Sequence, residues 1–143
     1  MKAGARYPVR LEKEDDGYVV TLPDIPYGAT QGENRAHALA QAEDFLEEAI
    51  LGMMAHGDEV PTPTPARGRP TVALPLLTAA KLETYRAMRA AGLNKRQLAA
   101  RLGWRPSRVT RLFDGRHTSR LDQIETEDGQ VFNLLSSRSA RRV

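Results

Sequence analysis

The sequence predicts an α+β fold, in which a small, antiparallel-rich sheet with one packed helix is linked to an all-helical domain. Three observations predict it. Apolar and polar residues alternate from Arg6 onward, as in half-buried strands. Apolar residues then recur at three- and four-residue steps from Ala38 to Met54, which is typical of one face of a helix. A proline-rich segment, residues 57–70, disfavours helix and separates these elements from a helical second half.

Charge is divided unequally along the chain. Residues 1–60 carry five basic and twelve acidic side chains, a net charge of −7, and residues 61–143 carry sixteen basic and six acidic side chains, a net charge of +10. A basic half can neutralise phosphates and an acidic half suits a basic partner, so the two halves are expected to have different partners. The alternative is that both are solvated surfaces that bind nothing.

Several classes of protein are disfavoured by what the sequence lacks. It has no cysteine, which excludes disulfides and thiolate metal sites and suits a reducing cytoplasm. No apolar run approaches the roughly 18 residues of a membrane span, and no secretory signal is found, so no membrane contact is expected. His37, His56 and His117 lack ligand spacing, so no metal or other cofactor is expected. The motifs of phosphate-binding loops, nucleophile elbows and zinc proteases are absent, and the chain is not expected to be an enzyme.

The first domain is predicted over residues 1–56 and begins with a hairpin. Its first strand starts at Arg6, the Asp-Asp-Gly sequence at 15–17 supplies a turn, and residues 18–22 form the second strand. A short third strand is predicted at Ala29–Gln31. The domain therefore has a small sheet made mostly of antiparallel strands.

Asn34 is a favourable N-cap for the helix that follows the sheet. The apolar stripe of this helix faces the sheet, and the opposite face carries Asp44, Glu47 and Glu48, so the helix shows an acidic face to water. The two methionines at its end can line an adaptable binding surface, but burial in the core is favoured at this spacing.

After the linker, residues 71–75 contain a short apolar run that forms either a last strand of the first domain or an arm that pairs with another subunit. The second domain is predicted over residues 76–135, and residues 136–143 form a basic, disordered tail. Within the second domain, Ser119 can cap a further helix, and residues 131–135 either complete the core or form a dimer contact.

Residues 94–113 have the spacing of a helix-turn-helix. A preceding helix, capped by Thr78, is predicted to end at Gly92. Asn94 and Gln97 have the spacing of a capping box, which begins the next helix.

The helix-turn-helix spacing is physically demanding. Ala99 must be small where two helices cross, Gly103 must permit a tight turn, and Pro106 suits the first position of the last helix. The side chains expected to fill the small core are Leu98, Leu102, Val109 and Leu112. Trp104 either closes the edge of this core or stacks on a base, and the first interpretation is favoured.

The helix that begins at Pro106 is the expected recognition helix, whose N-terminal and outward side chains enter the major groove of DNA. Arginine binds guanine O6 and N7 through two hydrogen bonds, while Ser and Thr contact bases or phosphates. The expected contacts of this helix are Arg108 and Arg111 to bases or nearby phosphates, supported by Arg105, Ser107 and Thr110. The expected contacts of the preceding helix to the DNA backbone are Lys95, Arg96 and Gln97.

The run YVVTLPDIPYGATQGENRAHALAQAEDFLEEAI, followed later by VALP, resembles the N-terminal domain of HicB-type antitoxins. The matching positions, in a Pro-Asp loop and its Thr-x-Gly exit, are Pro23, Asp24, Pro26, Thr30 and Gly32. Tyr27 departs from the family, since many members have glycine there, and Arg35-Ala36-His37 replaces a segment usually richer in glutamate. The resemblance implies a partial ribonuclease-H-like fold for this domain. The helix-turn-helix is similar to the repressor-type one that many HicB proteins carry.

This resemblance implies a cytoplasmic antitoxin of a type II toxin–antitoxin pair. Such a protein neutralises a small, basic, HicA-like mRNA-cleaving toxin by direct binding and represses its own operon through operator double-stranded DNA. The unequal charge is an independent reason, because complementary charge accelerates the capture of a basic toxin. A homodimer or tetramer is expected, because one helix-turn-helix covers only one half-site. The candidate toxin contacts are Asp15, Asp16, Asp24, Asp44, Glu47 and Glu48.

Two other functions stay open at this point. The chain can be a stand-alone transcription regulator with a ligand-sensing N-terminal domain, or a nuclease tethered to DNA. Nuclease chemistry of the ribonuclease-H type needs several carboxylates that converge on two divalent ions. The acidic residues are predicted in a turn, in a loop and on the outer face of a helix, so convergence is not expected.

Overall fold

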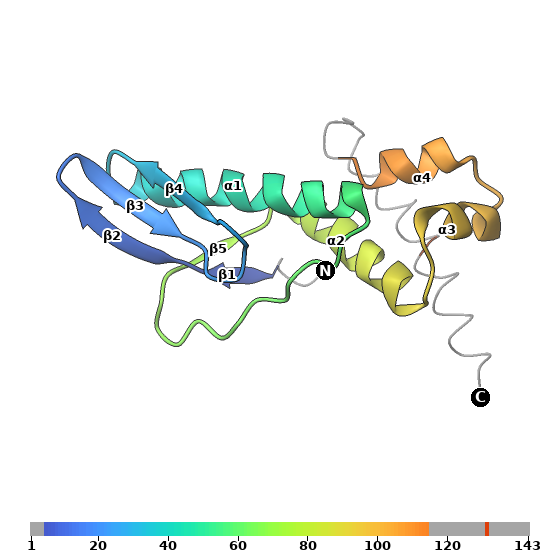
Figure 1. Cartoon of the computed structure of the whole chain (residues 1–143), viewed down its shortest axis with the longest axis horizontal. Coiled ribbons are helices and arrows are strands. Elements are labelled where there is room, and N and C mark those ends of the chain that lie inside the picture. Colours follow the sequence, from blue (N-terminus) through green and yellow to red (C-terminus); the bar gives the residue numbers. More distant parts are fainter. Residues whose placement is uncertain (1–4, 115–130, 132–143) are drawn as a thin grey trace. The chain divides into compact units, whose positions relative to one another are not determined.

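The computed structural model describes residues 5–114 and Val131 (Figure 1). The helix predicted from Ser119 and the basic tail at 136–143 lie outside the described residues. Within the segment 131–135, only Val131 is described, and its side chain is buried.

The chain divides into two compact units. Unit 1 comprises residues 1–52 and 60–76, and unit 2 comprises residues 53–59 and 77–143. Strands and one long helix make up the described part of unit 1, whereas the described elements of unit 2 are helical. The α+β class predicted from the sequence is confirmed.

Unit 1 contains two small antiparallel sheets (Figure 1). Strand β3 (Gly17–Thr21) pairs with β2 (Arg10–Glu14) on one side and with β4 (Ala29–Gly32) on the other. Strand β1 (Arg6–Pro8) pairs with β5 (Thr71–Ala73). The apolar run after the proline-rich segment is therefore a strand that pairs within its own chain.

The single first strand expected from Arg6 is in fact two strands. β1 ends at Pro8, which has no backbone N–H to donate to a ladder, and β2 begins at Arg10 with a different partner. Between them, the backbone N–H of Val9 donates to the carbonyl of Pro70 (2.9 Å). The sequence did not reveal this change of partner, because apolar residues keep alternating across the break.

Helix α1 (Arg35–His56) lies along one face of the three-stranded sheet (Figure 1). Its start is capped as predicted, since the Asn34 side-chain oxygen accepts the N–H of His37 (2.9 Å). β4 approaches this first turn so closely that a Cβ on Gly32 would collide with the backbone of Ala38. The core between helix and sheet is built from Val20, Leu22, Ala38, Ala42, Leu46 and Ile50.

Unit 2 contains α2 (Leu76–Ala90), α3 (Lys95–Leu102) and α4 (Pro106–Leu112), although Leu76 itself is assigned to unit 1. The prediction that Thr78 caps the first of these helices is wrong. α2 begins two residues earlier, directly after Pro75, and the Thr78 side chain is buried inside its first turn.

The core of unit 2 matches the helix-turn-helix expectation closely. The buried side chains of its helices include Leu82, Tyr85, Met88, Leu98, Ala99, Val109, Leu112 and Phe113. Tyr85 and Phe113 meet edge to face, with ring centroids 5.5 Å apart and planes at 82°. Leu102, which was expected in the core, is only half-buried. Of the two methionines at the end of α1, Met54 is fully buried, which agrees with a core role, and Met53 is half-buried.

No helix within the described residues is long and apolar enough to cross a membrane.

Candidate DNA-binding and partner-binding surfaces

The turn between α3 and α4 has the geometry that its residues predict. The Asn94 side chain accepts the N–H of Gln97 (2.8 Å), and the Gln97 side chain accepts the N–H of Asn94 (2.9 Å), which completes a capping box. Gly103 adopts a left-handed conformation (φ 69°) at the end of α3, and Pro106 occupies the first turn of α4. These local features fix the direction in which α4 leaves α3.

The structure brings the predicted base-contacting residues together on the solvent side of α4. Val109 and Leu112 point into the core, so the remaining positions of this short helix face outward. The exposed residues of this surface, here called the α4 surface, are Arg105, Ser107, Arg108, Thr110 and Arg111. The Thr110 hydroxyl donates to the carbonyl of Pro106 (3.2 Å), which holds that side chain against its own helix.

Arg108 has a defined neighbour on this surface. Its guanidinium carbon lies 3.7 Å from the centroid of the Trp104 ring, a cation–π arrangement. Trp104 is half-buried, so one part of its ring closes the edge of unit 2 while the other supports Arg108. The sequence interpretation assigned Trp104 to the core edge and missed this second role. The four-residue spacing between Trp104 and Arg108 is the sequence signal that could have revealed this contact.

Of the residues expected to contact the DNA backbone, Arg96 is exposed and Gln97 caps α3. The Lys95 side chain instead packs within unit 2. Its ammonium donates to the carbonyl of Ala55 (3.2 Å) and lies 6.0 Å from the centroid of the Phe113 ring. Burial lowers the pKa of Lys95 below its usual value.

Lys95 is one of three side chains that hold residues 55–58 in unit 2. The Tyr85 hydroxyl donates to the Asp58 carbonyl (2.7 Å), and the Arg89 guanidinium donates to the Gly57 carbonyl (2.6 Å). Burial is the main cause that raises the pKa of Tyr85. Carbonyls at the end of a helix lack partners within that helix, and cationic side chains satisfy them favourably. Sequence patterns did not indicate these contacts, because the partners lie 27 to 40 residues apart.

A buried cation, Lys81, similarly binds a carbonyl at the end of α4. The Lys81 side chain is only 3% exposed, and its ammonium donates to the carbonyl of Asp114 (3.1 Å), just beyond the helix. A residue of α2 thus fixes the C-terminal end of the helix that carries the α4 surface.

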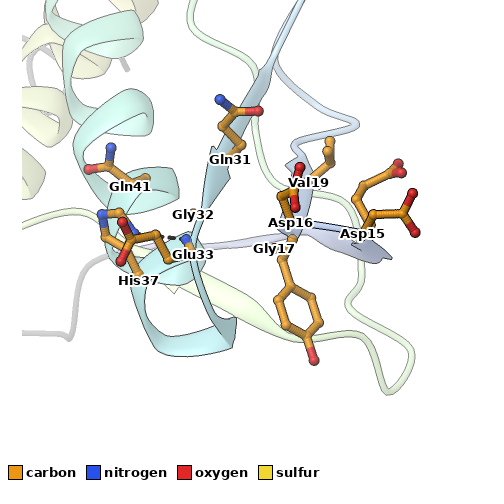
Figure 2. Close-up of a pocket in the computed structure, with 11 residues that line it drawn as sticks. Asp15, Asp16, Gly17, Val19, Gln31, Gly32, Glu33, His37 and Gln41 are labelled. Atoms are coloured by element: carbon orange, nitrogen blue, oxygen red, sulfur yellow. Dashed lines mark hydrogen bonds between the residues drawn. The ribbon is translucent and has the colours of Figure 1, made fainter.

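The acidic residues of unit 1 do not form one cluster. Asp15 and Asp16 lie in the β2–β3 turn, on one side of an open pocket, and His37 and Gln41 of α1 lie on the other (Figure 2). The His37 ring nitrogen Nδ1 accepts the N–H of Glu33 (3.0 Å). The pocket is lined by Glu14, Asp15, Asp16, Gly17, Tyr18, Val19, Gln31, Gly32, Glu33, His37 and Gln41.

Strand register explains how this pocket forms. Glu14 pairs with Gly17, and Tyr18 pairs with Gly32, so the hairpin turn meets the exit of β4. A Cβ on Gly17 would collide with the carbonyl of Gly32, so this junction needs glycine. The sequence analysis predicted no pocket and did not single out Glu14 or Glu33, because it did not follow the strand pairing beyond the first hairpin.

The other four candidate acidic residues lie away from the pocket lining. The Asp24 carboxylate accepts the backbone N–H (3.0 Å) and the hydroxyl (3.1 Å) of Thr64, so it anchors the proline-rich segment to the β3–β4 loop. Asp44 and Glu48 are exposed on α1, and Glu47 is half-buried. Within the described residues, no group of three His, Cys, Asp or Glu side chains is arranged to hold a metal ion.

Comparison with known proteins gives the class to which this two-unit chain belongs. Residues 6–83 match the family model described as HicB_like antitoxin of bacterial toxin-antitoxin system. The class is therefore that of antitoxins, which have a toxin as their partner and a non-enzymatic role.

Relatives of nearly equal length make the assignment specific. The chain is 39% identical to Antitoxin HicB 1 of Photorhabdus laumondii over 83% of this chain and 77% of that one. It is 32% identical to Antitoxin HicB of Escherichia coli K12 over 84% of this chain and 88% of that one. The chain belongs to the HicB-like antitoxin family, as the resemblance in the sequence indicated.

Proposed function

We propose that this chain neutralises a HicA-like, mRNA-cleaving toxin by direct binding and represses its own operon by binding operator DNA, both in the cytoplasm. The observation that carries the proposal is the α4 surface. Three exposed arginines, Arg105, Arg108 and Arg111, stand on a well-formed helix-turn-helix in a chain of an antitoxin family.

On DNA, α4 enters the major groove with its exposed side directed at the bases. Arg108 and Arg111 read guanine or contact nearby phosphates, and Arg105, Ser107 and Thr110 support them. Arg96 and the amide nitrogen of Gln97 contact the backbone. We assign Lys95 to the packing of unit 2, because its ammonium is already bonded to a backbone carbonyl.

A single helix-turn-helix covers one half-site of a palindromic operator. The functional form is therefore a homodimer or tetramer, since two-fold symmetry of the protein then matches two-fold symmetry of the DNA.

Toxin binding is assigned to unit 1. Asp15 and Asp16 at the pocket and, separately, Asp44 and Glu48 on α1 are exposed carboxylates that suit a cationic RNA-binding protein. Covering the toxin's RNA-binding surface is enough to inhibit it, so the antitoxin needs neither a metal nor a catalytic group. Asp24 acts indirectly, because its carboxylate orders the loop through Thr64. Glu47 is half-buried on α1 and is the less accessible candidate.

The test is co-expression of this chain with the product of the neighbouring short, basic reading frame. We expect the neighbour alone to stop growth, the pair to restore it, and the two proteins to copurify. The pair is also expected to retard DNA from upstream of the operon in gels. A neighbour that is harmless, or that is toxic but not rescued, contradicts the proposal.

A second candidate function is a stand-alone transcription regulator that senses a small ligand. The observation that favours it is the open pocket of unit 1, which combines carboxylates with Tyr18, Gln31 and His37. Its distinguishing result is DNA binding that responds to small molecules in a genome that encodes no toxin beside this gene.

A further inference from the structure

Tyr27 is unusual in two independent ways. Its side chain is fully exposed (101%), whereas Leu76, the next most exposed large apolar residue among those described, is 46% exposed. Its backbone is left-handed (φ 58°), a conformation that a bulky residue rarely adopts because its Cβ crowds the following carbonyl. Tyr27 therefore gains little from burial and adds backbone strain.

The loop that carries Tyr27 is held in place by the fold. The Leu22 N–H donates to the Gly28 carbonyl (2.8 Å), and the Gly28 N–H donates to the Ile25 carbonyl (2.9 Å). Ile25 is 3% exposed and anchors the loop in the core of unit 1, while Asp24 ties it to Thr64. The left-handed conformation thus belongs to an ordered loop, and the ring is presented outward from a fixed base.

A strained and exposed residue on a rigid loop is a candidate for function, because the fold itself gains nothing from it. Tyrosine is enriched among the residues that dominate binding energy at protein interfaces. Its ring is large and has few rotatable bonds, so it loses little entropy when it docks. Tyr27 on this loop has the properties of a preorganised anchor.

We propose that Tyr27 is an anchor by which unit 1 docks onto the basic protein toxin, with its ring against Lys or Arg side chains of that partner. This inference rests on the proposed function. Unit 1 carries seven basic and ten acidic side chains, a net charge of −3, and Asp24 is the one charged residue in the loop 22–28. A cationic partner meets no repulsion at this loop, and an ammonium or guanidinium over an aromatic face is attracted to it. A second copy of unit 1 has the same negative charge, so it is less complementary to this loop than a basic toxin is.

The experiment compares Tyr27→Asn with Tyr27→Phe in the full chain, bound to the purified toxin. Asparagine tolerates left-handed backbone, so Tyr27→Asn should keep or raise the melting temperature. It should also weaken toxin binding at least tenfold, mainly through faster dissociation. Tyr27→Phe keeps the ring and should bind within about threefold of the unmodified chain. Tyr27→Gly, which suits the backbone best, provides a second loss-of-ring variant.

The outcomes separate this inference from the proposed function. Unchanged toxin affinity in folded Tyr27→Asn and Tyr27→Gly overturns the anchor and leaves toxin neutralisation intact. Weakened self-association with unchanged toxin affinity also overturns the anchor proposal, because Tyr27 then binds a second copy of the chain. An unmodified chain that does not bind the toxin removes the proposed function and the anchor together.

Discussion

The α4 surface and the open pocket of unit 1 differ in how far apart in the sequence their residues lie. The α4 surface, with the cap and turn that orient it, falls within residues 94–111. The pocket combines residues 14–19 with 31–33 and with 37 and 41, which come from three strands, the turn and exit between them, and a helix. A surface built locally depends on a few side chains and on its own caps, whereas a surface built from distant segments depends on the whole unit. The two should therefore respond differently to point mutation.

The largest effect is expected from Arg108→Ala combined with Arg111→Ala. A good arginine–guanine pair contributes about 1–3 kcal/mol, so loss of both should weaken operator binding by roughly 100-fold or more. Toxin neutralisation should be unchanged, because both residues belong to unit 2. Gel retardation and growth rescue measure the two functions separately.

The matched control removes two exposed arginines from unit 1, as Arg10→Ala with Arg35→Ala. It lowers the net charge equally and should leave operator affinity within about threefold at physiological salt. Loss of both functions in a folded Arg108 and Arg111 variant would contradict the division of labour between the two surfaces.

The second-largest effect is expected on the stability of unit 1, from a substitution at Gly32 of the pocket lining. A Cβ at Gly32 collides with the backbone of Ala38, so Gly32→Ala should destabilise unit 1 by about 2–3 kcal/mol. For a unit of this size the melting temperature should fall by roughly 10 °C. Toxin binding should weaken with it, while operator retardation persists. Thermal unfolding followed by circular dichroism provides the measurement.

Gly52→Ala is the matched control for that substitution. The same added methyl group meets no atom within 4 Å, and alanine favours helix, so α1 should be stabilised by about 0.5–1 kcal/mol. The two variants should therefore shift the melting temperature in opposite directions. Parallel loss of DNA binding in Gly32→Ala would mean that unit 2 does not fold without unit 1.

The same contrast explains what the sequence could predict. The capping box at Asn94, the left-handed Gly103 and the helix start at Pro106 follow from nearest neighbours, and all were found. The break between β1 and β2 and the contact between Lys95 and Ala55 depend on partners 40 or more residues away. Periodicity describes which face of an element is apolar, but it does not say which distant segment covers that face.

A smaller effect is expected at the pocket rim. Asp15→Asn with Asp16→Asn removes two charges from an exposed turn, where each contributes chiefly to steering. The association rate with the toxin should fall about three- to tenfold at low salt, with little change in dissociation. The difference should vanish at high salt, where these charges are screened. Stopped-flow or surface plasmon measurements at two ionic strengths test this, and a salt-independent loss would contradict it.

The smallest effect should come from Trp104→Leu, which keeps apolar cover at the edge of unit 2 but removes the ring beneath Arg108. An exposed cation–π contact contributes about 0.5–1 kcal/mol, so operator affinity should fall roughly two- to fivefold. The salt dependence of binding should stay the same, because no phosphate contact is lost. Trp104 is the sole tryptophan of the chain, so Arg108→Ala should alter the intrinsic fluorescence of the free protein. If Trp104→Leu leaves operator affinity unchanged while Arg108→Ala lowers it, Arg108 binds DNA without support from the ring, and the α4 surface depends on still fewer residues.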